Sequence, residues 1–459
     1  MSTRARIALA AILIVAAAFC FRVVDAWHVP AGDGIQYWQI AQQLEKRLTL
    51  AYSDRGQPAY TRLPGYPMFL AFVASRAAAL ERTADHHLER ATRANVLLHI
   101  LTSLLIWWML RVRNVRGEWA ALIATLTCPF LILLTCYGLS ETLATFLGVL
   151  EVALAVRAMR GDRLVLFAIL AGVAAGLAQL VRADAVTCAP SVLIALACAN
   201  AHPRRRMLAI AACGIAAGVV FAPWPIRNLS QFGAMHAEGH QWPAQDGGAP
   251  PLGVIHWMRT WSASRYGEAY VPFKMVNRMP VDEHNLVKEM WDSEAEHQRV
   301  SALFKKYSKE GLTPAVDGEF EQLAAERRHR EPWRTWVTLP SGRLVALWTP
   351  VPEYELPMRI PWLGLPAHRG AFGWWEALAA LLAIVGVIAL ARRERAFLVV
   401  AILPLVTRSI LHSLAVPHGV TMRYLVEAVP FLTLLAGVGI VAIVNLARRR
   451  GASTSLESR

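Results

Sequence analysis

The sequence is 459 residues long; 55% of its residues are hydrophobic, only 17% are charged, and its formal net charge is +14. Soluble globular proteins carry about 25% charged residues, so this composition excludes an ordinary soluble protein and indicates an integral membrane protein. The positive charge lies in short arginine clusters along the chain, which argues against a nucleic-acid-binding patch.

Apolar segments of about the 20 residues that a helix needs to cross a bilayer recur along the chain. Hydropathy predicts ten spans, at residues 7–27, 92–111, 118–136, 140–158, 164–181, 185–201, 207–225, 372–391, 396–416 and 424–446. The sequence therefore predicts an all-α polytopic membrane protein.

Arginine clusters separate alternate predicted spans and indicate the orientation of the chain. They are Arg4/Arg6, Arg111/Arg113/Arg116, Arg157/Arg160/Arg163, Arg204/Arg205/Arg206, Arg392/Arg393/Arg395 and Arg448/Arg449/Arg450. Because cytoplasmic loops are enriched in Lys and Arg, this alternation predicts that both termini are cytoplasmic. We expect a multi-pass protein of the plasma (inner) membrane, with a cytoplasmic tail at 451–459.

Two long segments are then predicted to be extracytoplasmic. The first, 28–91, has an amphipathic helix over 35–48 and a second, apolar helix over 66–80 that is too short to span comfortably. The second, 228–371, is polar and rich in Trp and Pro. These segments divide the chain into a seven-helix module at 1–227, the segment 228–371 and three further spans at 372–450.

The second extracytoplasmic segment has helical periodicity over 284–309 and 317–328. After it, Trp333, Trp336 and Trp348 lie among basic residues. Two readings fit this composition: a helix or hairpin in the lipid headgroup belt, or a small soluble subdomain that packs its own tryptophans.

Asp33 is the first candidate for chemistry. It follows the first span in HVPAGDGIQYWQI, four residues before Tyr37, and the motif TRLPGYPMF places Arg62 and Tyr66 a short distance later. A carboxylate at the mouth of a helix bundle can act as a general base toward an acceptor hydroxyl. The structural alternative is that Asp33 caps the helix that begins at Gly34.

Glu141 is the second candidate acid, because it opens the fourth predicted span directly after Ser140. An ionisable side chain near the membrane is costly and indicates a functional site. A charge favoured by the helix dipole is the alternative. If Asp33 and Glu141 face one cavity, they share a divalent cation or divide the work of base and substrate orientation.

Arginines on the same predicted membrane face supply positive charge. Arg182 and Arg227 lie at the outer ends of spans, Arg408 lies inside the ninth span, and Arg423 with Tyr424 begins the tenth. The planar guanidinium binds two phosphate oxygens at once. Snorkelling to the interface is the alternative, although Arg408 is predicted deep enough to require a partner.

These elements resemble the GT-C superfamily of membrane glycosyltransferases, in particular proteins similar to glycosyltransferase family 39. That group includes protein O-mannosyltransferases and lipid A aminoarabinose transferases. The matching residues are Asp33 with Tyr37 and Ala41, Arg62 to Pro67, Ser140-Glu141, Arg182, Pro223 to Asn228 with Phe232-Gly233, and Arg423-Tyr424 followed by Pro430. The resemblance covers residues 1–233 well and the rest in patches.

The resemblance implies a GT-C-like bundle that transfers a sugar, with inversion, from a polyprenyl-phosphate donor to an extracytoplasmic lipid, glycan or protein. In a bacterial host the carrier would be undecaprenyl phosphate. It implies Asp33 as the catalytic base, with Glu141 as the candidate second acid. The expected substrate-binding residues are Tyr37, Arg62, Tyr66, Arg182, Arg227, Arg408, Arg423 and Tyr424. Many relatives have two adjacent acids in the first loop, whereas Asp33 lies between two glycines, which leaves a metal requirement open.

Two other classes of protein share this composition. A transporter or flippase of a lipid-linked sugar would place ionisable groups near the midplane and show repeat symmetry with broken helices. Only Arg408 and His412 fit that description in this sequence. A non-catalytic subunit of a cell-envelope assembly could use the segment 228–371 as its docking part.

Overall fold

The computed structural model describes residues 2–26, 32–52, 59, 62–74, 84–233, 252–263, 271, 274–275, 280–282, 286–349, 359–360, 365–366, 369–415 and 422–457. The chain forms two compact units. Unit 1 comprises residues 1–238, 352–407 and 426–459, and unit 2 comprises 239–351 and 408–425.

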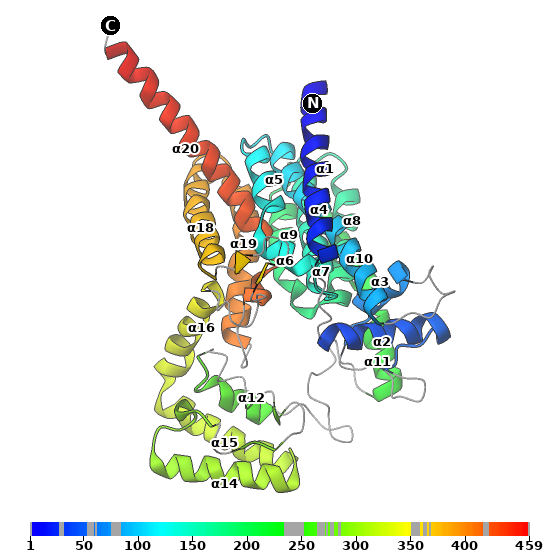
Figure 1. The fold of residues 1–459 in the computed structure, drawn as a ribbon, viewed down its shortest axis with the longest axis vertical. Coiled ribbons are helices and arrows are strands. Elements are labelled where there is room, and N and C mark those ends of the chain that lie inside the picture. The colour runs from blue at the N-terminus through cyan, green and yellow to red at the C-terminus, as the bar shows by residue number, and fades with distance from the viewer. Residues whose placement is uncertain are drawn as a thin grey trace. The chain divides into compact units, whose positions relative to one another are not determined.

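Unit 1 is helical over almost all of its described residues (Figure 1), as predicted for an all-α membrane protein. Its first helices are α1 Thr3–Ala26, α2 Gly32–Arg47, α3 Gly65–Ala74, α4 Ala84–Val112, α5 Glu118–Leu126, α6 Pro129–Thr135, α7 Glu141–Ala158 and α8 Leu164–Val181. Next come η2 Ala183–Cys188, α9 Ala189–Ala197, α10 Pro203–Phe221, α11 Pro223–Phe232, α18 Arg369–Ala391, the start of α19 Arg395–Ala415, and α20 Val429–Glu457. The strands β1 Arg359–Ile360 and β2 Leu365–Pro366 form a short antiparallel pair.

Within the described residues, six helices are long and apolar enough to cross a membrane, or eight if each of two bent pairs is one span. The six are α1, α4, α8, α18, α19 and α20. The bent pairs are α5 with α6 and α10 with α11, and a proline begins the second helix of each pair. The protein is therefore a multi-pass membrane protein.

Two of the ten predicted spans differ from this simple form. The predicted span 140–158 is the helix α7, which lies at the predicted place but contains Glu141, Glu151 and Arg157. The predicted span 185–201 is a 3-10 turn followed by the short helix α9. The helix α7 is buried over most of its length between α4 and α8, whereas the second segment keeps exposed apolar side chains at Val186 and Leu193.

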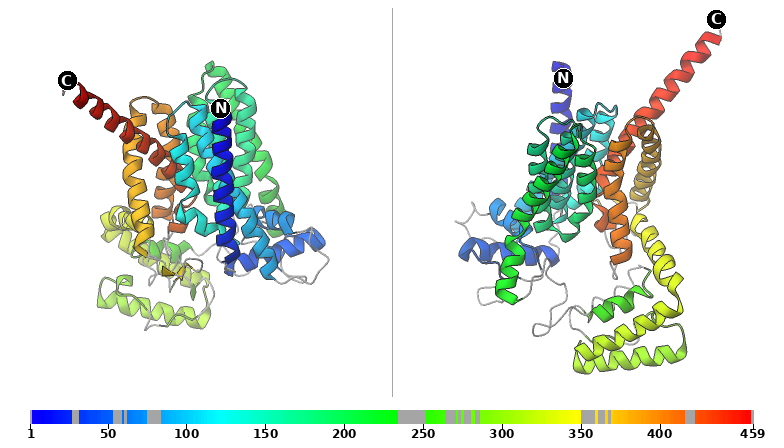
Figure 2. Two further views of the ribbon diagram at one scale, coloured as in Figure 1. Left: turned by 45° about the horizontal axis from the view of Figure 1, so that its top comes forward. Right: turned by 180° about the vertical axis from the view of Figure 1, so that it is seen from behind.

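Glycines allow the bundle helices to approach closely, as small residues do in membrane proteins. Gly172 and Gly176 of α8 face the backbone of α10, and Gly386 of α18 faces the backbone of α20. The two views in Figure 2 show α8 and α10 running side by side through the bundle.

The two helices predicted for the first loop are α2 and α3. They pack against each other, and α3 also packs on α4 and α8. Figure 1 shows α2 lying crosswise to the long helices of the bundle. Residues 75–80, the end of the second predicted helix, lie outside the described residues.

Unit 2 is a small helical unit. Its elements are α12 Leu252–Arg259, η6 Lys288–Met290, α14 Glu294–Glu310, α15 Pro314–Arg330, the π-helical turn η7 Arg334–Thr338, α16 Leu339–Trp348, the end of α19, and η8 Met422–Leu425. Ser293 and Thr313 cap α14 and α15 by accepting backbone N–H groups from Glu296 and Val316. The core contains the packed rings of Trp257, Trp261, Phe304 and Phe320.

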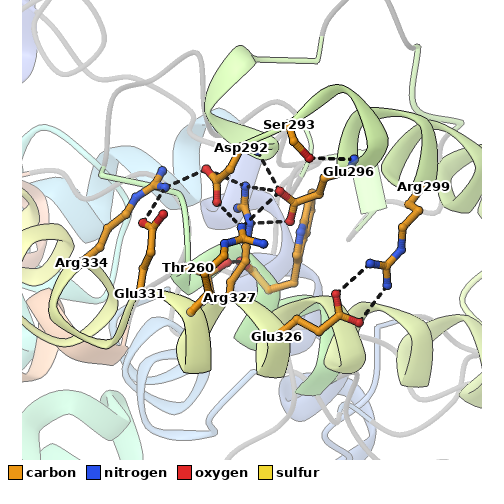
Figure 3. A network of polar contacts seen from close by, with 11 residues as sticks. Thr260, Asp292, Ser293, Glu296, Arg299, Glu326, Arg327, Glu331 and Arg334 are labelled. Atoms are coloured by element: carbon orange, nitrogen blue, oxygen red, sulfur yellow. Dashed lines mark hydrogen bonds and ion pairs between the residues drawn. The ribbon is translucent and has the colours of Figure 1, made fainter.

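Charged side chains join α14 to α15 and to the turn after it (Figure 3). Arg327 is 2% exposed, and its Nε donates to Glu296 at 2.8 Å. Asp292 accepts from Arg330 at 2.6 Å and from Arg334 at 2.7 Å. A buried cation therefore has acidic partners from the neighbouring helix, as its desolvation requires.

Candidate active site

Asp33 lies in the first turn of α2, and its partner Arg62 lies just before α3. Nη2 of Arg62 donates to Oδ1 of Asp33 at 2.6 Å, and Nε donates to Gln36 at 2.9 Å. The guanidinium also lies 5.2 Å above the ring of Tyr37. The Asp33 side chain stays 40% exposed in this pair. The structure thus brings Asp33, Tyr37 and Arg62 together as one accessible polar group.

The Pro-Gly-Tyr-Pro turn fixes where this group sits against the bundle. A Cβ added at Gly65 would lie 2.7 Å from the carbonyl carbon and oxygen of Leu180, so only glycine fits where α3 meets the end of α8. Tyr66, the next residue, is fully buried. Its ring meets that of Tyr37 edge to face, with centroids 5.0 Å apart.

The buried phenol of Tyr66 is affected by the charge of Glu141. Burial raises the pKa of the Tyr66 phenol well above its usual value, and the negative charge of Glu141 raises it further. The ring contacts join Arg62 to Tyr37 and Tyr37 to Tyr66.

Arg182 occupies the centre of a buried cluster of acids. It lies just past the end of α8 with an extended backbone, between Val181 and η2. Its guanidinium contacts Glu141 at 3.2 Å, Asp184 at 2.9 Å and Glu427 at 3.0 Å. Glu141 is 1% and Glu427 is 2% exposed. The guanidinium predicted to bind phosphate thus joins the starts of α7 and η2 to the residues that precede α20.

Glu427 was not predicted as a site residue. It lies inside the tenth predicted span, in the sequence MRYLVEAVP. The rule that an ionisable residue within a span indicates a functional site would have selected it. The same rule would have selected Glu151, which is 2% exposed on α7.

The two carboxylates expected to share a divalent cation each contact a guanidinium in the structure, Asp33 that of Arg62 and Glu141 that of Arg182. Over the part of the chain that the structure describes, no group of three or more His, Cys, Asp or Glu side chains is arranged to hold a metal ion. Glu141 and its two acidic neighbours surround the guanidinium of Arg182, which already supplies positive charge at their centre.

Arg227 binds the first loop. It lies in α11, in the bent pair that starts at Pro223-Trp224-Pro225. Nη1 donates to the backbone oxygen of Ala59 at 2.9 Å, and Nη2 donates to that of Leu50 at 3.2 Å. Its guanidinium lies 4.9 Å from the ring of Trp224. The arginine therefore holds two parts of the loop that carries Asp33 and Arg62.

The remaining predicted residues form a second group, in unit 2. Arg408 is 1% exposed, and its Nε donates to the backbone oxygen of Tyr424. The Tyr424 ring stacks on His412 with centroids 5.0 Å apart. Arg423 lies beside Tyr424 in η8 and is partly exposed. The backbone oxygen of Tyr424 is therefore the polar partner that the buried guanidinium of Arg408 requires.

Comparison with known proteins gives the fold. Neither a protein-family profile nor a curated protein sequence matches the chain. The oligosaccharyltransferase of Archaeoglobus fulgidus, solved as a complex with Zn and sulfate, aligns over 97% of the chain with a TM-score of 0.51 and 12% identity. Its apo form aligns over 98% with a TM-score of 0.53 and 10% identity. That oligosaccharyltransferase is a GT-C glycosyltransferase. The chain has the GT-C fold.

The match confirms the fold that the first-loop motif predicted. The chain spans about half the length of the oligosaccharyltransferase, 51% of the complex and 52% of the apo chain. ArnT from Cupriavidus metallidurans bound to undecaprenyl phosphate also aligns, over 96% of this chain and 78% of its own, with 16% identity and a TM-score of 0.42. In this GT-C fold, the predicted residues Asp33, Tyr37, Arg62 and Tyr66 gather where α2 and α3 meet the bundle.

Proposed function

We propose that this chain is a membrane glycosyltransferase that transfers a sugar, with inversion, from a polyprenyl-phosphate-linked donor to a lipid, glycan or protein. The observation that carries the proposal is the Asp33–Arg62 pair at 2.6 Å, with a carboxylate that is 40% exposed, in the first loop of a GT-C fold. The structural similarity to an oligosaccharyltransferase supports glycosyl transfer as the type of reaction.

Asp33 acts as the general base in this proposal. It takes the proton of the acceptor hydroxyl as that oxygen bonds to the anomeric carbon, and the bond from this carbon to the lipid phosphate breaks. Such assistance is worth about 10²–10⁴ in rate. Because a phosphate is a good leaving group, one displacement suffices and the configuration inverts. Arg62 orients the carboxylate by donating to Oδ1 at 2.6 Å.

The remaining predicted residues divide between support and phosphate binding. Glu141 and Arg182 are buried together, which suits orientation of the bundle ends that frame Tyr66. Arg227, Arg408 and Arg423 are the candidates for the donor phosphate, since a guanidinium can bind two of its oxygens. Tyr37 supplies an aromatic surface beside Arg62, and Tyr424 supplies one beside Arg423.

In this proposal the reaction occurs on the extracytoplasmic side of the plasma (inner) membrane, and the alternating arginine clusters support that orientation. A polyprenyl-phosphate sugar is held by that membrane, so the donor and the first loop would share one surface. The acceptor then comes from the cell envelope.

Purified protein in nanodiscs, given a radiolabelled polyprenyl-phosphate sugar and an envelope extract, tests the proposal. A transferase moves the label to an acceptor and releases polyprenyl phosphate, and the product has the opposite anomeric configuration. In proteoliposomes, a flippase would instead move the intact lipid-linked sugar across the bilayer. An assembly subunit would do neither. Label that stays on the carrier with every donor and extract would contradict the proposal.

A further inference from the structure

An apolar face is exposed along η7 and α16 in unit 2. Trp333, Val337 and Val345 lie at multiples of four residues, with Leu344 beside them, so they share one side of the helix. Trp333 is 72%, Trp336 63% and Val345 62% exposed. This spacing leaves large side chains on one surface that the described part of unit 2 does not cover.

The opposite side of α16 is fixed to the end of a membrane-spanning helix. Arg343 is 1% exposed, and its guanidinium donates to the backbone oxygens of Ser262 at 2.8 Å, Arg259 at 2.7 Å and Ser413 at 3.2 Å. Trp348 donates from Nε1 to Oγ of Ser409 at 3.1 Å. Ser409 and Ser413 belong to the last turns of α19.

These contacts determine where the end of α16 lies along the apolar span of α19. The apolar span in α19 runs from Arg395 to Leu414. Ser409 lies five residues before its end, about 7 Å along the helix axis at 1.5 Å per residue. Amphipathic helices at a membrane surface bury their apolar face by about 5–10 Å. On α19 itself, Ile410 is 51% and Leu414 44% exposed, so the last turns of α19 also present apolar side chains.

We infer that η7 and α16 form an interfacial membrane helix, with Trp333, Val337, Leu344 and Val345 in contact with the lipid of the leaflet at the carboxyl end of α19. Tryptophan is the residue that gathers at the headgroup level. Trp257 and Trp261 pack in the core of unit 2, whereas Trp333 and Trp336 are exposed. The membrane contact would keep unit 2 at the bilayer surface whatever reaction the chain catalyses.

Spin labels in the full-length protein test the contact. Single cysteines are placed at Val345, at Ile410 as the lipid-facing reference, and at the exposed Ser308 of α14 as the solvent-facing reference. The exposed Cys198 is first replaced by serine; the other cysteines are buried. In nanodiscs, collision rates are measured with oxygen, which concentrates in lipid, and with a water-soluble nickel chelate.

The label at Val345 should collide more with oxygen than with nickel, as the label at Ile410 does, while Ser308 should show the reverse. Nickel collisions at Val345 equal to those at Ser308 would show that the face is in water. Low collision rates with both reagents would show that a protein covers it. Either of these two results overturns the inference.

Discussion

Arg182 pairs with two buried acids of unit 1, Glu141 and Glu427. Replacement by glutamine would leave Glu141 and Glu427 buried with their counter-charge removed. Breaking a buried ion pair in this way costs about 3–5 kcal/mol. We therefore expect Arg182→Gln to lower the thermal midpoint strongly in detergent, as measured by fluorescence-detected size exclusion.

Arg157→Gln is the matched control, because Arg157 pairs with Asp162, whose side chain is 58% exposed. Surface pairs contribute about 0–1 kcal/mol, so this variant should unfold close to the wild-type midpoint. Equal midpoints for the two variants would mean that the Arg182 cluster contributes no more than a surface pair.

At the residue scale, short motifs selected residues that the structure brings together. Asp33 pairs with Arg62, and the ring of Tyr66 meets that of Tyr37. Glu427 was missed because it meets Arg182 only through the packing of α20. A single sequence shows the cost of a buried charge, but it does not show which distant acid meets it. The contacts of Arg227 with the backbone oxygens of Ala59 and Leu50 could not be predicted for the same reason.

Among the elements, the start of α3 depends on one glycine. In a Gly65→Ala variant the new methyl group would lie 2.7 Å from backbone atoms of Leu180, which cannot move as a side chain does. We expect α3 to shift and transfer activity to fall at least tenfold, since misplacement by about 1 Å can cost 10²-fold. Gly218→Ala on α10 is the control, because nothing lies within 4 Å of its added Cβ. An active Gly65→Ala enzyme would contradict the role given to this turn.

The ion pairs of unit 2 predict a response to acid. Burial alone would raise the pKa of Asp292, but the hydrogen bond from Arg334, the charge of Arg327 and the hydrogen bond from Arg330 outweigh it and lower that pKa. A lowered carboxyl pKa stabilises the fold above the unfolded pKa of about 4, and this contribution is lost as pH falls through the folded value. Unit 2 should therefore keep this contribution to its stability from pH 7 to about 5 and lose it progressively below about 4.

The Asp292→Asn variant should be less stable than the wild type at pH 7, and it should lose less stability than the wild type on acidification. Intrinsic tryptophan fluorescence, to which the buried Trp257 and Trp261 contribute in this unit, can follow unfolding of the full chain across pH. The same loss of stability below pH 4 in both proteins would show that Asp292 does not contribute.

Most helices could be predicted from apolar length and periodicity, as α14, α15 and the long spans show. The helices differ from these predictions where proline interrupts a span or where neighbouring helices bury charged residues. Pro129 and Pro223 begin new helices and bend two spans, because proline cannot continue the preceding ladder of hydrogen bonds. The charges of α7 are tolerated because neighbouring helices, not lipid, surround it.

For the whole molecule, the arginine clusters predict the orientation of every span. Reporter fusions at Gly161 and at the carboxyl end should report cytoplasm, and a fusion at Gly311, between α14 and α15, should report the outside. The measurement is paired alkaline phosphatase and fluorescent-protein activity in intact cells. An extracytoplasmic signal at Gly161 would reverse the side on which Asp33 lies.

The division into two units was only partly visible in the sequence. A boundary was expected at 228, and the compact units divide at 239. Residues 408–425 belong with the 239–351 segment, although they continue the membrane helix α19. Contacts such as those of Arg343 with Ser413 bring them together, and such contacts have no signature in local periodicity.

The most direct test of the proposed reaction compares two similar acids. Asp33 pairs with Arg62, and Asp25 pairs with Arg93; the two carboxylates are 40% and 44% exposed. In single-turnover transfer from a polyprenyl-phosphate sugar, Asp33→Asn should reduce the rate by about 10²-fold or more, because the base is lost, while donor affinity stays unchanged. Asp25→Asn should transfer at the wild-type rate. Near wild-type transfer by Asp33→Asn would contradict the assignment of Asp33 as the base.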